Sequence, residues 1–337
     1  MPTLARRLAA ALVALAALAT AAAAEPVKIR IGWSSMPAHM IPALYRAQGA
    51  LRHMGRTYTV EPVNFQASTP QITAMAAKQI DIAAFSPTAL VLGVTNARLD
   101  IKVVADTLQD GKAGHYSQTF YVRTDSGIDS VPDLKGKRVG TNAVGSASDT
   151  TLRAMLRKHN LDPRRDLQII EVSFANQLPM IEDGKIDATT IPMPMAHELV
   201  KSGKYKPLFS AVDVIGSTQF TFLAARAEFL EQNRAAVMDF FEDTVRAMRW
   251  FYDPKNREEG LKIVAEVSKR PVGSLYHLFT SMDYFRDPYL IPDVAGIQRA
   301  IDVTHELGFL QRRIDVAPAY VDLSFVEEAR RRIQANP

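Results

Sequence analysis

The sequence predicts an α/β protein made of two lobes, each with a mainly parallel sheet, that are joined by two crossing segments. Three observations support this fold class. From Val27 onward, apolar runs of period two alternate with helical segments, which is the pattern of crossover units around parallel strands. The same order of elements then occurs a second time along the chain. With 337 residues, the chain is also long enough to bury two hydrophobic cores.

The first half of the chain is expected to supply four strands with helices between them. The strands are predicted at residues 27–31, 58–65, 80–85 and 101–105, and the helices at 41–54, at 69–78 and directly after Ser86-Pro87. Thr69-Pro70 and Ser86-Pro87 each combine an N-cap residue with a proline, which suits the first turn of a helix. An irregular segment at 109–114 follows the fourth strand.

Three motifs carry the repeat. Strand 137–140 matches strand 28–32, the unit "MIEDGKIDATTIPMP" matches "MAAKQIDIAAFSP", and Thr218–Arg226 matches Ser117–Arg123, with offsets between 101 and 108 residues. Because separate motifs keep nearly one offset, we predict that the second lobe repeats the plan of the first. Asp81 and Asp187 occupy matching positions, which indicates a shared structural role rather than a catalytic pair.

The matched strands 117–123 and 218–226 indicate where the chain passes between the lobes. We expect lobe 1 at residues 25–112 and 214–337, lobe 2 at 113–213, and crossing segments at 107–116 and 211–217. The last part of the chain is expected to be helical and to pack on lobe 1, with helices at 234–252, 258–268, 273–282, 293–310 and 324–334.

Residues 1–24 are typical of a secretory signal. Arg6 and Arg7 precede a short Ala/Leu run, and Ala22-Ala23-Ala24 supplies an A-x-A cleavage site. The run is too short and too rich in alanine to be a membrane span. We therefore expect an exported protein, cleaved after about Ala24.

Composition excludes several classes of protein. The chain has no cysteine, so it has no disulfide, thiolate metal site, cysteine nucleophile or lipid-bearing cysteine. A formal charge of +4, from 40 basic and 36 acidic residues, is too small for a nucleic-acid-binding protein. An exported chain without a lipid anchor is most useful in a closed compartment, which indicates a Gram-negative periplasm.

Ligands of open parallel sheets bind where strands end and loops enter helices, so we expect these loops of the two lobes to face one cleft. The predicted ligand-binding residues are Trp33, Ser34, Ser35, Ser68, Thr69, Phe85, Ser86, His115, Tyr116, Asn142, Ser146, Ser148, Asn176, Pro192 and Met193. They include no Lys or Arg. Helix starts accept anions through free amides and the helix dipole, so the set favours a small organic anion with an apolar body. The alternative is that the hydroxyls only cap helices and the aromatic and Met residues are core.

Motifs of enzymes are absent from the sequence. Gly140 to Gly145 has the glycine spacing of a phosphate loop, but Ser146 stands where lysine is needed. Neither G-x-S-x-G nor H-E-x-x-H occurs. We therefore expect no catalytic residue, no metal and no cofactor.

Three further motifs carry a family resemblance. They are "IDSVPDLKGKRVGTN" (Ile128–Asn142), the repeated Ile-Asp units at Ile80 and Ile186, and the tail "ELGFLQRRIDVAPAYVDLSFVEEA" (Glu306–Ala329). Together they resemble the periplasmic substrate-binding proteins of nitrate/sulfonate/taurine-type ABC importers, in the superfamily of thiamine-pyrimidine-precursor binders.

The resemblance implies a type II periplasmic-binding-protein fold, with two lobes that close over a ligand. It implies a non-enzymatic monomer that delivers its ligand to permease subunits at the inner membrane, driven by a cytoplasmic ATPase. Because the predicted loops lack basic residues, an organic sulfonate, carboxylate or aromatic compound is favoured over nitrate or bicarbonate. Two alternatives stay open: an exported enzyme that uses the same cleft, and a periplasmic ligand sensor for a membrane receptor.

Overall fold

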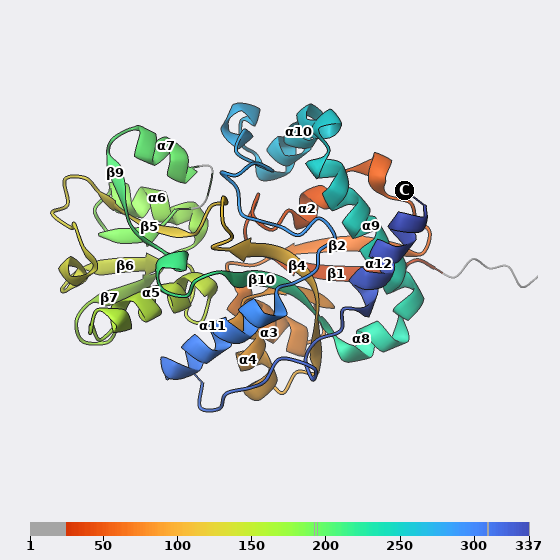
Figure 1. Ribbon diagram of the computed structural model, residues 1–337, viewed down its shortest axis with the longest axis horizontal. Coiled ribbons are helices and arrows are strands. Elements are labelled where there is room, and N and C mark those ends of the chain that lie inside the picture. The colour runs from red at the N-terminus through yellow and green to blue at the C-terminus, as the bar shows by residue number, and fades with distance from the viewer. Residues whose placement is uncertain (1–24, 192, 194, 309, 337) are drawn as a thin grey trace, which may run out of the picture.

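Two five-stranded sheets lie side by side in the computed structural model, which describes residues 25–191, 193, 195–308 and 310–336 (Figure 1). The predicted signal segment, 1–24, lies outside the described residues. We call the first sheet with its helices lobe 1 and the second sheet with its helices lobe 2. The residue limits proposed for the lobes from the sequence stay a prediction.

The sheet of lobe 1 has four mutually parallel strands and one antiparallel strand, β10. Its order is β2 (Tyr58–Asn64), β1 (Val27–Trp33), β3 (Ile82–Phe85), β10 (Thr218–Arg226), β4 (Ile101–Asp110). Strand β1 pairs in parallel with β2 and β3, whereas β10 is antiparallel to both of its neighbours, β3 and β4.

The sheet of lobe 2 repeats this arrangement. Its order is β7 (Gln168–Glu171), β6 (Arg138–Thr141), β8 (Ala188–Thr190), β5 (Thr119–Arg123), β9 (Tyr205–Ser210). Here β5 is the antiparallel strand, so β5 and β10 occupy equivalent places in the two sheets. The predicted α/β class with mainly parallel sheets is confirmed, and so is the match between strands 117–123 and 218–226.

Helices cover both faces of the first sheet and flank the second (Figure 1). They are α2 (Ile41–Leu44), α3 (Ser68–Ala76), α4 (Pro87–Thr95), α5 (Ala147–Lys158), α6 (Phe174–Glu182), α7 (Met195–Lys201), α8 (Ala227–Gln232), α9 (Arg234–Tyr252), α10 (Arg257–Ser268), α11 (Val294–Glu306) and α12 (Ser324–Ala335). Short 3₁₀ turns are η1 (Gln48–Ala50), η2 (Val131–Leu134), η3 (Ala211–Asp213), η4 (Pro254–Asn256) and η5 (Val272–Leu275). Within the described ranges, no helix is both long enough and apolar enough to cross a membrane.

Strand β3 shows how lobe 1 builds two cores. All four of its residues are buried, and successive side chains point to opposite faces of the sheet. Ile82 and Ala84 pack in the core formed with α2, α9 and α12. Ala83 and Phe85 pack in the core formed with α3, α4 and α11. The central strands are therefore fixed from both sides, which leaves the strand ends and loops to form the site.

Each lobe also carries the same arginine–aspartate clamp. Arg30 on β1 donates to Asp81 from its backbone nitrogen (3.0 Å), Nε (2.9 Å) and Nη2 (2.7 Å). Arg138 on β6 makes the same three contacts with Asp187, at 2.8, 3.1 and 3.0 Å. Asp81 accepts a further bond from Arg226 at 2.6 Å. The shared structural role predicted for the two aspartates is confirmed.

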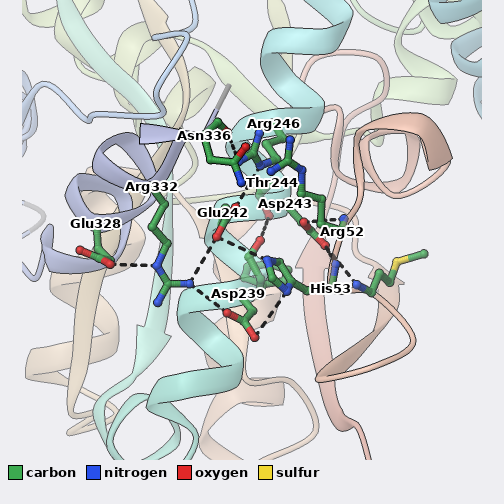
Figure 2. Close-up of polar contacts among 12 residues, drawn as sticks. Arg52, His53, Asp239, Glu242, Asp243, Thr244, Arg246, Glu328, Arg332 and Asn336 are labelled. Atoms are coloured by element: carbon green, nitrogen blue, oxygen red, sulfur yellow. Dashed lines mark hydrogen bonds and ion pairs between the residues drawn. The ribbon is translucent and has the colours of Figure 1, made fainter. Parts of the chain in front are cut away.

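A helix predicted over residues 41–54 is wrong, because α2 ends at Leu44. The physical reason is Asp243 on α9, whose buried carboxylate accepts the backbone N–H groups of Arg52 (2.8 Å), His53 (2.8 Å) and Met54 (3.0 Å) and the Tyr58 hydroxyl (2.8 Å) (Figure 2). A carboxylate taken out of water is stable only when its oxygens are hydrogen-bonded. The loop therefore turns around this carboxylate instead of continuing as a helix.

The helix predicted over 273–282 is also wrong. Only η5 forms, and the chain then turns because the Asp283 carboxylate accepts the backbone N–H groups of Phe279 (3.1 Å) and Tyr284 (2.8 Å). Phe279 has a φ of 59°, a left-handed conformation that cannot continue a right-handed helix. The predicted cap at Thr69 is wrong as well: α3 begins at Ser68, with Ala67 as its N-cap.

Substitution of the aspartate in each of the two clamps should lower the free energy of unfolding by different amounts. Asp81→Asn should lower the free energy of unfolding by about 2–3 kcal/mol, because it breaks a buried pair with two arginines. Asp187→Asn should lower it by about 1 kcal/mol or less, because the Asp187 side chain is 24% exposed against 1% for Asp81. Urea unfolding followed by circular dichroism measures both values, and equal losses would contradict the comparison.

The loss for Asp81→Asn should also depend on pH. Burial opposes the charge of Asp81, but hydrogen bonds from Arg30 and Arg226 outweigh this effect and lower the pKa of the carboxyl. Because the pKa is lower in the folded protein, the stabilisation is complete above the unfolded value of about 4 and disappears as pH falls through the folded value. The difference from the parent protein should therefore shrink below about pH 4 in the same unfolding measurement.

Candidate ligand-binding site

A cavity lies between the two lobes and takes its walls from both. It contains about 610 Å³ of space that no atom fills, with solvent at its mouth included. The predicted residues that line it are Ser34, Ser35, Ser68, Asn142, Ser146, Ser148 and Met193. The structure therefore brings loops of both lobes together around one space.

Several other predicted residues are part of the lobe structure. Trp33 is half-buried against the core of lobe 1, and Phe85 is fully buried between the sheet and its helices. Ser86 caps α4 by accepting the Ala89 amide at 3.2 Å. Thr69 donates its hydroxyl hydrogen to the Val144 carbonyl at 3.0 Å and so links the two lobes.

The remaining predicted residues lie beside the cavity or away from it. Tyr116 packs edge-on against Tyr284, a lining residue, with ring centroids 4.9 Å apart. His115 packs in the same manner against Phe285, at 5.3 Å. Asn176 is exposed on α6. Pro192 lies outside the described residues.

Other lining residues were missed by the sequence analysis. They are Pro37, Ala38, His39, Leu108, Gln118, Ala147, Phe174, Phe220, Thr221, His277, Asp283 and Tyr284. His39 follows Ser34 and Ser35 within the same loop, so extending that loop would have found it. The sequence gives no indication that His277 and Asp283 lie at the cavity. Its pattern predicts a helix over 273–282 that does not form, instead of a loop that reaches the site.

Two helices begin at the cavity, one from each lobe. Ala147 and Ser148, in the first turn of α5, line the cavity, as does Ser68 at the start of α3. Backbone amides in the first turn of a helix have no acceptor within the helix. The α5 start is fixed by Ser146, whose Oγ accepts the Asp149 amide at 3.3 Å. Both helix ends present partial positive charge to the same space.

Side-chain charge in the wall is already neutralised. Asp283 is paired with the fully buried Arg286, whose Nη1 lies 2.7 Å from Oδ2 of Asp283. Arg286 also donates to the Ala38 carbonyl from Nη2 at 2.8 Å and from Nε at 3.1 Å. No Lys or Arg belongs to the described lining. An anion in the cavity would therefore be attracted by helix ends and amides, rather than by a cationic side chain.

Two histidines of the wall differ in their partners. His39 accepts the Ser34 amide at Nδ1 (3.3 Å), and its Nε2 lies 3.5 Å from the Thr221 hydroxyl. Burial, assisted by the nearby Arg286, lowers the pKa of His39 to about 3, so the ring is neutral. Burial also lowers the pKa of His277. Neither nitrogen of His277 makes a hydrogen bond of standard geometry among the described residues, although the Ser274 backbone lies nearby and partly opposes the effect of burial.

The two lobes touch through the loop between β6 and α5. Gln66 donates its side-chain amide to the Asn142 carbonyl at 2.9 Å. Farther out, the Thr88 and Thr150 hydroxyls lie 2.8 Å apart. These bonds, together with that of Thr69, join the lobes on the side of the cavity formed by α3, α4 and α5.

A group of metal-ligand type lies between α9 and the loop before β2, away from the cavity. Atoms of His53, Asp239 and Glu242 lie within 4.8 Å of one another, the one such group in the described ranges. Arg332 already binds Asp239 (3.0 Å) and Glu242 (3.3 Å), and Arg246 binds Glu242 at 3.0 Å (Figure 2). The group is an ion-pair network that fastens α12 to α9.

Comparisons with solved structures show the fold. The alkanesulfonate-binding protein SsuA from Xanthomonas axonopodis pv. citri, bound to MOPS, is 21% identical, with a TM-score of 0.68 over 88% of this chain and 99% of that chain. The aliphatic sulphonate binding protein SsuA from Escherichia coli is 20% identical, with a TM-score of 0.67 over 88% and 92%. The nitrate-binding protein NrtA from Synechocystis PCC 6803 is 14% identical, with a TM-score of 0.73 over 92% and 90%.

These likenesses confirm the predicted periplasmic-binding-protein fold. A comparison with curated protein sequences finds no match. The model of the NMT1-like family, in contrast, matches residues 22–265, well over half of the chain. The family resemblance inferred from the motifs is thus confirmed, and the chain belongs to the NMT1-like family.

Proposed function

We propose that this protein is the substrate-binding component of an ABC importer and captures a small organic anion between its lobes. The observation that carries the proposal is the meeting of two helix starts, at Ser68 and at Ala147-Ser148, in one interlobe cavity whose described lining contains no Lys or Arg. The likeness to sulfonate- and nitrate-binding proteins supports the class of function. No lining group is assigned a catalytic role.

Magnitudes favour an organic anion over a small inorganic one. A micromolar Kd corresponds to about 8 kcal/mol, whereas each helix end contributes roughly 0.3–1 kcal/mol, and up to about 2 in a partly buried site. The rest must come from amide hydrogen bonds and from burying an apolar body. Apolar surface for that body is supplied by Leu108, Phe174, Met193, Phe220 and Tyr284.

Capture would proceed by lobe closure. The predicted crossing segments lie next to the cavity, since Leu108 of the first segment and Phe220, three residues after the second, both line it. Bending at two such segments is a hinge motion of the kind that closes binding proteins around ligands. We propose a periplasmic monomer without a lipid anchor, which releases its ligand to permease subunits coupled to a cytoplasmic ATPase.

A ligand panel tests the binding proposal. Protein that has been unfolded and refolded to remove carried-over ligand should be stabilised by at least one organic sulfonate or carboxylate, by about 2.7 kcal/mol at 100 times Kd. Neutral sulfones or amides of the same shape should have no effect, because they lack the charge that the helix ends attract. Thermal shift measures this stabilisation. Failure of every anion in the panel would overturn the proposal.

A proline at the start of α5 tests the anion site directly. Ala147→Pro removes one lining amide hydrogen but suits the first helical position, and Ser146 already has the extended backbone (φ −73°, ψ 167°) that precedes proline. Because a hydrogen bond to a charged group contributes about 1.5–3 kcal/mol, affinity for an anion should fall about 10- to 100-fold.

Ala147→Val is the matched control, since it adds similar bulk and keeps the amide hydrogen. Isothermal titration calorimetry with an anion from the panel measures both variants. Equal loss in the two variants would show that bulk alone, and not the amide, matters at this position.

Transport separates the importer from its alternatives. In cells that lack this protein, uptake of the radiolabelled anion should fall to background and return when the exported protein is supplied. Normal uptake combined with a lost transcriptional response would favour a sensor. Conversion of the anion by purified protein, followed by mass spectrometry, would favour an exported enzyme.

A further inference from the structure

Two polar side chains in the cavity wall carry buried atoms that make no hydrogen bond of standard geometry within the described protein. His277 is 1% exposed, and neither of its buried ring nitrogens makes a hydrogen bond of standard geometry, although the Ser274 backbone lies close enough to act on the ring. Gln118 is 5% exposed, and its buried Oε1 also makes no such bond. Both residues line the cavity. Buried polar groups in folded proteins are normally paired, so an unpaired set at a cavity calls for an explanation.

Several other polar residues of the wall have partners. His39 has partners at both ring nitrogens, as described above, and Asp283 is paired with Arg286. Ser146 and Ser148 both donate to Asn142 Oδ1. Among the described lining residues, buried side-chain atoms without a partner therefore occur at Gln118 and His277.

We propose that His277 and Gln118 form a second polar subsite, which binds a hydrogen-bonding group of the ligand that is distinct from its anionic group. The inference deepens the proposed function and rests on it. Gln118 Oε1 can only accept a hydrogen bond, whereas a neutral imidazole has one donor and one acceptor. The ligand must therefore donate at least one hydrogen bond here, from an N–H or O–H group.

The position of the two residues couples this subsite to lobe closure. Gln118 directly precedes β5 of lobe 2, and its own amide is fixed by Asp110 Oδ2 at 2.7 Å. His277 belongs to the segment after η5, which follows α10 of lobe 1. The preceding residue, Tyr276, already contacts His197 of α7 in lobe 2, with ring centroids 5.7 Å apart. A donor group held by both residues would bridge the lobes.

The substrate class is therefore an organic acid that also carries an amine, amide, hydroxyl or N–H heterocycle. Discrimination should be strong, because a site built around buried polar groups rejects an analogue that leaves them unpaired. An acid of the same shape without the donor would leave the Gln118 oxygen unpaired and would bind more weakly.

Matched ligand pairs test the subsite by calorimetry. The probes are taurine against ethanesulfonate, 4-aminobenzenesulfonate against benzenesulfonate, and 4-hydroxybenzoate against benzoate. The parent protein should bind the donor-bearing member of at least one pair tenfold or more tightly. In Gln118→Met and in His277→Phe, this ratio should fall at least fivefold.

These measurements distinguish failure of the proposed function from failure of the subsite inference. If no anion binds the parent protein, the proposed function fails. If anions bind but both members of every pair bind alike, or if both variants keep the ratio, the subsite inference alone is overturned.

Folding of the variants supplies an independent readout. Because each substitution replaces an unpaired buried polar group with an apolar one, the ligand-free variants should melt at or above the parent temperature. His39→Phe is the control, since it removes a histidine with partners and should melt lower. A lower melting temperature for both His277→Phe and Gln118→Met would show that these groups are already paired in the free protein, and would overturn the inference.

Discussion

The antiparallel pairing of β4 with β10 is the constraint on which the two-lobed structure depends. It runs from Ile101 opposite Arg226 to Asp110 opposite Thr218 and so holds both crossings of the chain together. Beyond it, the buried Asp110 carboxylate accepts the Gln118 amide, which sets where lobe 2 begins. At the turn, Gly111 has a φ of 72°, and a Cβ there would lie 2.9 Å from Val212 Cγ2. The paired crossings therefore form both the connection between the lobes and a wall of the cavity.

The proposed binding of an anion without a cationic side chain would follow from where the arginines are used. Arg30 and Arg226 are held by Asp81, Arg138 by Asp187, and Arg286 by Asp283. Each of these arginines is used in a structural ion pair. The positive charge that faces the cavity comes instead from the amino ends of helices, which the packed strands hold in place. Recognition then depends on direction more than on net charge. An anion bound as proposed would have to place its oxygens along fixed N–H directions, which would favour selection by shape over general electrostatic attraction.

Much of this fold could be predicted from local pattern, but the loops that complete the site could not. Strand β10 and helix α9 lie where the apolar periodicity placed them, because burial of regular faces decides both. The helices predicted over 41–54 and 273–282 do not form, because the carboxylates of Asp243 and Asp283 accept hydrogen bonds from backbone amides that the local pattern assigns to helices. Among site residues, serines at strand ends were found by topology. Gln118 and His277 were not, since their partnerless burial exists only once the lobes have assembled.

Strand β5 follows the strands of the first sheet but pairs in the second, and β10 follows the strands of the second sheet but pairs in the first. This arrangement also sets an order of assembly. Every strand of the second sheet lies between Thr119 and Ser210, so that sheet is complete in one uninterrupted stretch of chain. The first sheet is not, because β10 must enter between β3 and β4 after the whole of lobe 2 has been made. A chain that emerges from its amino end would thus leave the gap between β3 and β4 open until the later lobe is finished. The earlier half of the protein is the last to close.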